Sequence, residues 1–194
     1  MEWVIDLVEA GGLLGLAAAI LLENVFPPIP SEVVLPLAGV AVGRGQLLFS
    51  GAVLAATAGS VAGALVLYAV ARLGGRPLLL RWSGVLRLDR AQLDRADAWF
   101  DRHGAWFVLL GRLVPGVRSV VSVPAGLSEM PLPKFVGLTA LGSAVWNAAL
   151  IGAGVALGEH HDVVGQAIGP VSTAAMAAVA VGVVALLLRA RRRA

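Results

Sequence analysis

The stretch Glu23-Asn-Val-Phe-Pro-Pro-Ile-Pro-Ser-Glu32 lies between two apolar runs and decides the fold of this chain. The runs, residues 10–22 and 33–43, carry no charge, yet each is shorter than the roughly 20 residues that cross a bilayer as a helix. A proline breaks a helix because it lacks the backbone N–H and its ring clashes with the preceding turn. The stretch holds three prolines, which are Pro27, Pro28 and Pro30. We expect a re-entrant helical hairpin over residues 10–43, which turns at the prolines and leaves the membrane on the side it entered.

The composition is that of an integral membrane protein. Of the 194 residues, 58% are hydrophobic and only 14% are charged. The net charge of +3 is small, and the basic tail 189–194 is typical of an anchor against anionic lipids, so we expect no nucleic-acid partner. The chain has no cysteine, which excludes disulfides and cysteine nucleophiles, and no residue pattern indicates a metal or a cofactor.

Three uncharged segments are long enough to cross a membrane, namely residues 47–71, 135–158 and 163–188. The polar turn Glu159-His-His-Asp162 joins the last two as an antiparallel pair. Small residues recur in these segments and allow helix backbones to approach closely. The clearest of them are Gly59, Gly63, Gly152, Gly154 and Gly158.

A second short apolar segment, residues 104–131, repeats the plan of the first. It has an apolar arm, a break at Pro115-Gly116 with Arg112 and Arg118 on either side, and a second apolar arm. Leu37-Ala-Gly39 and Pro124-Ala-Gly126 occupy matching places in the two segments, and a full span follows each one. We therefore expect residues 104–131 to form a second re-entrant hairpin.

Between the two halves, residues 72–103 carry seven arginines. Asp89 and Gln92 have the spacing of a capping box, and Gly104 has the position of a helix terminator. We expect an amphipathic helix over residues 90–103 that lies at the membrane interface or in solvent.

The arginine placement predicts the orientation. Loop 72–103 and tail 189–194 are expected in the cytoplasm by the positive-inside rule. The first hairpin then enters from outside and the second from the cytoplasm. The expected fold is a single all-α polytopic membrane domain, an inverted repeat of two re-entrant hairpins each followed by a transmembrane helix, with a further transmembrane helix at the C-terminus.

Four ionisable residues lie in the hairpins, namely Glu23, Glu32, Arg112 and Arg118. Each would cost roughly 2.5–3.5 kcal/mol at the centre of a membrane helix. One interpretation is a neutral ion-pair cluster, although buried ion pairs are poor sources of net stability. The other is a transport site, in which the arginines hold an anionic head group and a glutamate takes up a proton. Ser31 caps the outgoing arm or touches substrate; capping is the simpler role.

Arg118 is the stronger candidate of the two arginines on sequence alone. It follows the Pro115-Gly116 break, where freed backbone N–H groups are expected to join it around an anion. The hairpin-tip residues Pro27, Pro28, Pro30, Ser31, Pro115 and Gly116 are expected to shape the two turns.

The chain resembles the DedA family of membrane proteins, relatives of the eukaryotic VTT-domain proteins. The resemblance rests on Glu23–Glu32, Gly59-Ser-x-x-Gly63 with Tyr68, Gly75-Arg76, Gly111–Arg118, Pro124–Met130, Phe135 and Trp146-Asn147. It implies a lipid translocase of the bacterial cytoplasmic membrane, with its embedded acids at Glu23 and Glu32 and its essential arginines at Arg112 and Arg118.

These observations favour a transporter, not an enzyme, that flips an anionic lipid, and the resemblance indicates undecaprenyl phosphate. Proton coupling and a homo-oligomer stay open. An uncoupled phospholipid scramblase is the alternative on the same plan. A small-ion channel or exchanger would need a wet pore, and an enzyme acting on lipid phosphates would need a nucleophile or a metal site; the sequence contains no pattern for either.

Overall fold

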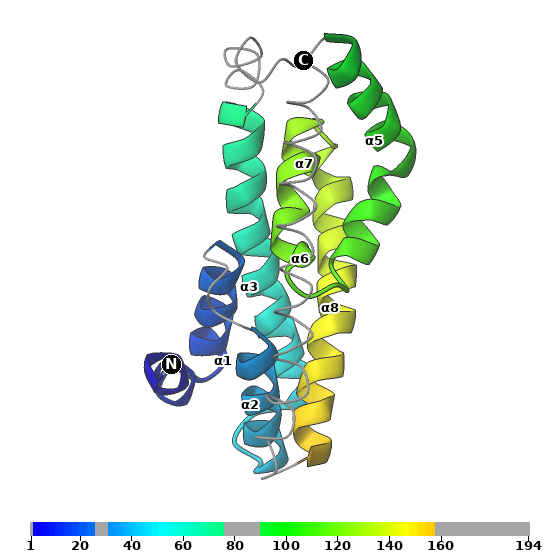
Figure 1. The fold of residues 1–194 in the computed structure, drawn as a ribbon. Helices are drawn as coiled ribbons and strands as arrows, with labels where there is room; N and C mark the ends of the chain where they lie inside the picture. Colours follow the sequence, from blue (N-terminus) through cyan, green and yellow to red (C-terminus); the bar gives the residue numbers. More distant parts are fainter. Residues whose placement is uncertain (1, 26–30, 76–89, 158–194) are drawn as a thin grey trace, which may run out of the picture.

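The structure, a computed structural model, describes residues 2–25, 31–75 and 90–157. Within these ranges the elements are helices, which confirms the all-α class (Figure 1). In chain order they are α1 (Glu2–Val25), α2 (Ser31–Gly43), α3 (Phe49–Val70), the π-helix η1 (Ala71–Gly75), α5 (Arg90–Gly111), α6 (Val117–Val120), α7 (Ser122–Leu127) and α8 (Leu132–Leu157). Several predicted features lie outside the described residues: Pro27, Pro28, Pro30, the turn 159–162, the span 163–188 and the tail 189–194.

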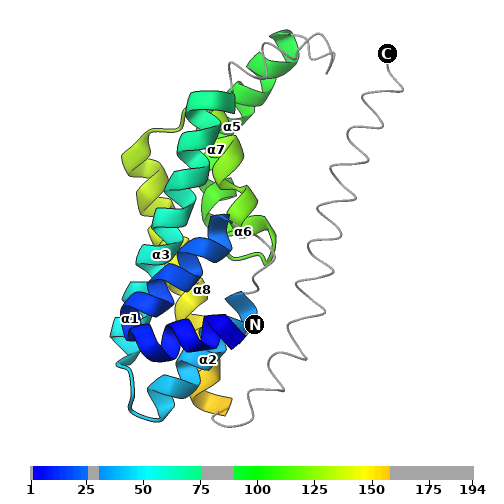
Figure 2. The same cartoon turned by 90° about the vertical axis from the view of Figure 1, so that its left-hand side faces the viewer.

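Two helices among the described residues are long and apolar enough to cross a membrane. They cover Phe49–Gly75 and Leu132–Ala156, and they match the predicted spans 47–71 and 135–158 to within a few residues. Both run side by side through the length of the molecule (Figures 1 and 2). The expected pair of central apolar helices is therefore confirmed as secondary structure.

The arms on either side of the prolines are shorter helices. Gly11–Val25 and Glu32–Gly43 are apolar, and each is too short to cross a bilayer. The first is the C-terminal part of α1, which is interrupted at Gly12, where the backbone has φ 53° and ψ −129°. Figure 2 shows the two parts of α1 at a steep angle to each other. Glycine allows this break because it has no Cβ to clash at positive φ.

The predicted helix end at Gly104 is wrong. Helix α5 runs without interruption from Arg90 to Gly111, so it joins the expected interface helix to the apolar segment that begins at Gly104. Gly104 is buried inside this helix, and a Cβ there would lie 2.6 Å from the ring of Phe100. The glycine makes room for that ring instead of ending the helix. The helix ends before the turn that holds Pro115, as the proline requires.

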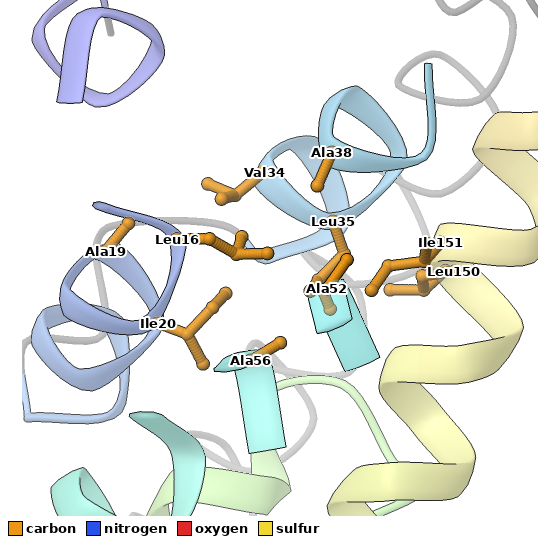
Figure 3. Close-up of a cluster of buried hydrophobic side chains, with 10 residues drawn as sticks. All are labelled: Leu16, Ala19, Ile20, Val34, Leu35, Ala38, Ala52, Ala56, Leu150 and Ile151. Carbon is orange, nitrogen blue, oxygen red and sulfur yellow. The ribbon is translucent and has the colours of Figure 1, made fainter. Parts of the chain in front are cut away.

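Two apolar cores lie along the central helices. The first is formed by α1, α2 and the adjoining halves of α3 and α8, and consists of Leu16, Ala19, Ile20, Val34, Leu35, Ala38, Ala52, Ala56, Leu150 and Ile151 (Figure 3). The second is formed by the other halves of α3 and α8 with α5, α6 and α7, and consists of Ala64, Tyr68, Phe100, Val108, Val121, Ala125, Met130 and Phe135. The boundary between the cores falls near residues 59–63 of α3 and residue 142 of α8.

Glycines bring α1 and α2 into backbone contact with the two long helices α3 and α8. A Cβ on Gly59 would strike the backbone of Ala17 in α1, and one on Gly63 would lie 2.6 Å from Cβ of Asn24. A Cβ on Gly39 of α2 would lie 2.8 Å from Cα of Gly154 in α8. The predicted close approach is thus confirmed at Gly59, Gly63 and Gly154, whereas Gly152 has only one atom at 4.0 Å.

Helices α5 and α7 pack against the long helices in the same manner. A Cβ on Gly142 of α8 would lie 2.8 Å from Cβ of Arg112, at the end of α5. Gly126 of α7 presses against the backbone at Tyr68 and Arg72, where α3 passes into η1. The hydroxyl of Tyr68 also donates a 2.6 Å hydrogen bond to the carbonyl oxygen of Met130. These contacts fasten α7 to the end of α3.

Candidate functional site

The four predicted charged residues are all buried; three of them lie in different helices, and the fourth directly follows a helix. Glu23 lies in the last turn of α1, Glu32 in the first turn of α2, Arg112 directly after α5, and Arg118 in α6. Because charges are rarely buried without partners, the neighbours of each group define what the cluster can do.

Glu23 and Arg118 form an ion pair. Nη2 of Arg118 donates to Oε2 of Glu23, and both side chains are almost completely shielded from solvent. This contact joins the end of α1 to α6, so the two broken segments meet at their charged tips. The carboxylate of Glu23 also lies within electrostatic reach of Glu32 and Arg112, which places all four charges in one cluster.

Arg112 has a different environment. Its side chain is only 1% exposed, and its Nη1 donates to Oδ1 of Asn24 at 3.1 Å. Its Nη2 donates to Oγ of Ser122 at 2.9 Å, while its Nε has no hydrogen-bond partner among the described residues. Both partners are neutral, and Arg118 lies close enough to repel Arg112. Within the described part of the chain, the Arg112 guanidinium is held in place but makes no ion pair.

Asn24 connects the two arginines. Its Nδ2 donates to the carbonyl oxygen of Ile20 at 3.0 Å and to Oε2 of Glu23 at 3.2 Å. The same Glu23 oxygen accepts from Arg118, and the Asn24 oxygen accepts from Arg112. The result is one hydrogen-bonded chain from Arg112 through Asn24 and Glu23 to Arg118.

Glu32 is buried, with 6% of its surface exposed. No hydrogen bond or ion pair joins it to another residue in the ranges that the structure describes. It therefore differs from Glu23, whose charge is offset directly by Arg118.

The break between α5 and α6 is a tight turn at Pro115-Gly116. Gly116 has a φ of 74°, a left-handed conformation that a side chain would strain. The backbone N–H groups of Val117 and Arg118 both donate to the carbonyl oxygen of Val114 at 3.2 Å. The expectation that freed N–H groups at this break would join Arg118 around an anion is therefore wrong at these two positions.

Two residues of the cluster were missed by sequence reasoning, namely Asn24 and Ser122. Both side chains are 0% exposed. Asn24 directly follows Glu23, one of the predicted site residues. An amide side chain between an embedded charge and a proline break is a sequence signal that could have identified Asn24. Ser122 carries no such signal, because serines are common in apolar helices and only the fold brings it to Arg112.

The described residues form a bundle of short and long apolar helices around buried charges, and two of these helices are long and apolar enough to cross a membrane. Comparison with known proteins gives its family: the VTT domain matches residues 29–156, and the chain belongs to this family, which confirms the resemblance to DedA proteins.

Three curated relatives are informative. The chain is 38% identical over 99% of its length to an "Alkaline phosphatase-like protein" of Lactococcus lactis subsp. cremoris, covering 92% of that protein. It is 34% identical over its full length to "Undecaprenyl phosphate transporter A" of Bacillus subtilis, covering 93% of it. It is 33% identical over 78% of its length to the protein of the same name from Staphylococcus aureus, covering 77% of it. No solved structure matches the chain significantly.

Proposed function

We propose that this protein transports a lipid phosphate, undecaprenyl phosphate, across the bacterial cytoplasmic membrane. Two relatives that carry the name of this activity align with most or all of the chain. The observation that carries the proposal is Arg112, a buried guanidinium whose described partners are both neutral.

A buried, unpaired cation is costly, and an oxyanion bound to it would offset that cost. A guanidinium has five N–H donors, of which Asn24 and Ser122 use two. The remaining donors include the unpartnered Nε and can form the parallel pair of hydrogen bonds that phosphate accepts. The head group would lie at Arg112, while the polyprenyl tail would stay in the surrounding lipid.

The packing of the arms supports the proposed inverted repeat. The incoming arm of each hairpin contacts the central helix that follows it, α1 on α3 and α5 on α8. The outgoing arm of each contacts the central helix of the other half, α2 on α8 and α7 on α3. An exchange of this kind is expected for two related units of opposite orientation, the plan on which alternating access in many transporters is based.

We assign different roles to the two acids. Glu23 would hold Arg118 in place, since the two form an ion pair. Glu32 would be the proton carrier, because it is buried without a described cationic partner. We place the arginine-rich segments 72–103 and 189–194 in the cytoplasm, as the positive-inside rule predicts.

The proposal is tested with purified protein in lipid vesicles that contain a fluorescent undecaprenyl phosphate analogue. Transfer of the analogue between leaflets is measured with and without a pH gradient, beside a zwitterionic phospholipid analogue of the same label. Release of inorganic phosphate is measured in the same samples, because one relative has a phosphatase-like name.

We expect protein-dependent transfer of the phosphate lipid, faster than that of the phospholipid and without phosphate release. Equal transfer of both lipids would indicate the scramblase instead. Phosphate release that follows the protein concentration would indicate a hydrolase. Ion flux without lipid transfer would indicate a channel or exchanger.

A further inference from the structure

We propose that Asn24 and Ser122 are positioning residues that hold Arg112 through neutral oxygens and so keep its positive charge available for the lipid phosphate. The inference rests on the proposed function and adds to it the residues that make the anion site selective. The neutrality of the two partners is the essential feature, because a carboxylate in either place would occupy Arg112 permanently.

The orientation of the Asn24 amide is determined by its three contacts. Its NH₂ group faces two acceptors, the Ile20 carbonyl and the Glu23 carboxylate, and its oxygen faces the Arg112 guanidinium. The flipped amide would set oxygen against oxygen at Ile20 and Glu23, and N–H against N–H at Arg112. Asn24 can therefore present only its carbonyl oxygen to Arg112.

The two residues that hold Arg112 come from different halves of the chain. Asn24 belongs to the first broken segment and Ser122 to the second, and each binds a different terminal nitrogen of Arg112. The Cβ of Arg112 also rests on Gly142, which leaves no room for the side chain to withdraw toward α8. The guanidinium is thus fixed in position while it keeps donors for an anion.

Arg118 differs from Arg112 in the charge of its partner. Arg118 lies in the same cluster and at similar burial, but its partner is the Glu23 carboxylate. An oxyanion that approached Arg118 would have to displace an internal carboxylate, whereas at Arg112 it would compete only with neutral oxygens. The Arg118–Glu23 contact joins two opposite charges, whereas the contacts of Arg112 join one charge to neutral groups, so the two arginines differ in availability.

The test compares binding of farnesyl phosphate and of farnesol to the full-length protein in detergent, measured by calorimetry at neutral and at acidic pH. Inorganic phosphate is included as a competitor to distinguish a lipid phosphate site from a site for the free anion. Asn24→Asp is the main variant, because it keeps the size of the side chain and replaces the amide with a carboxyl, which at neutral pH is charged and lacks the N–H donors to Ile20 and Glu23.

At neutral pH we expect Asn24→Asp to weaken farnesyl phosphate binding about ten-fold or more. At acidic pH the new carboxyl becomes neutral and its O–H can replace the amide donor, so binding should recover. The charges that surround position 24 and act on this titration are Glu23, Glu32, Arg112 and Arg118. Ser122→Asp should weaken farnesyl phosphate binding to the same extent. It replaces Asn24→Asp in the test if that variant does not fold.

Asn147→Asp is the matched control. Asn147 is equally buried and also bonds to a neutral side chain, since its Nδ2 donates to Oγ1 of Thr57 at 3.3 Å. It makes no described contact with Arg112, so Asn147→Asp should bind farnesyl phosphate as the parent protein does.

Neutral-pH binding by Asn24→Asp and Ser122→Asp equal to that of the parent would overturn the inference and leave the proposed function standing. Equal loss in Asn147→Asp would also overturn it, because the effect would then belong to any buried carboxyl. If the parent protein itself does not distinguish farnesyl phosphate from farnesol, the proposed function fails.

Discussion

Arg112 and Arg118 show how two identical side chains in one buried cluster can have different partners. Arg118 is paired with Glu23, and Arg112 is held by Asn24 and Ser122. Sequence reasoning ranked Arg118 first because of its position after a proline break. Because Arg112 has only neutral described partners, we propose the opposite order and expect the stronger functional effect at Arg112.

The first prediction concerns lysine substitutions. Arg112→Lys should insert and accumulate normally but lose lipid transport about ten-fold or more, because an ammonium group cannot form the parallel hydrogen bonds to phosphate. Arg118→Lys should be milder, since a point charge can still pair with Glu23. Initial rates in the vesicle assay check both variants. If both lysine variants transport normally, the cluster is a structural ion-pair network.

The second prediction separates the two acids. Glu32→Gln should leave the protein folded and remove the dependence of transport on the pH gradient. Glu23→Gln should instead destabilise the protein by about 3–5 kcal/mol, because it leaves Arg118 buried without its partner. Thermal unfolding in detergent and gradient-driven transport are measured for each variant. Gradient-driven transport that persists in Glu32→Gln would contradict a proton-carrying role for this residue.

The charged residues of the cluster could be predicted because a charge within an uncharged apolar segment stands out. Their partners could not. Asn24 and Ser122 are neutral, and the hydrogen bonds that Arg112 makes to them join residues 88 and 10 positions away in sequence. Which arginine forms the ion pair with Glu23 depends on the three-dimensional arrangement of the helices.

At the scale of the elements, small residues determine how closely the helices pack. Backbone contact between α2 and α8 depends on Gly39 and Gly154, and that between α1 and α3 on Gly59 and Gly63. Because lipid provides no hydrophobic drive for helices to associate, these close contacts carry much of the packing. The small residues thus predicted close approach at Gly59, Gly63 and Gly154, although not which helices meet there. Gly104 was misread because a helix can also use glycine to accommodate a ring.

The third prediction compares two glycines of α8. A Cβ on Gly154 would strike the backbone of Pro36 in α2, with the Pro36 Cα at 2.9 Å, whereas one on Gly137 meets nothing within 4 Å. Gly154→Ala should lower the midpoint of thermal unfolding, because backbone cannot move aside as a flexible side chain can. Gly137→Ala should leave it unchanged or raise it, since alanine is the better helix former by roughly 1 kcal/mol. Equal midpoints for the two variants would contradict the packing at α2.

For the whole molecule, the succession of helices on either side of each charged segment, with a long helix after each pair, could be predicted from the order of features in the sequence. The exchange of outgoing arms between the halves could not, because nothing in the local sequence states which central helix an arm will contact. That choice depends on surfaces distant in the chain, such as Gly39 and Gly154.

The fourth prediction concerns orientation in the membrane. In this cysteine-free chain, a single cysteine at His161 should react with an impermeant reagent added from outside, and one at Arg192 should react only from the cytoplasm. Labelling of intact and permeabilised cells checks both positions. Labelling of the cysteine at His161 from the cytoplasmic side alone would contradict the topology and the inverted repeat.

The exchange of outgoing arms has a consequence for assembly. Neither half can complete its own interior, because α2 finds its glycine-lined partner in α8 and α7 finds its partner at the end of α3. A chain divided within residues 76–89 should therefore behave as two complementary fragments that are degraded when produced singly and restore one another when produced together. In that sense the two halves behave like the subunits of an obligate heterodimer that happens to be encoded as one polypeptide.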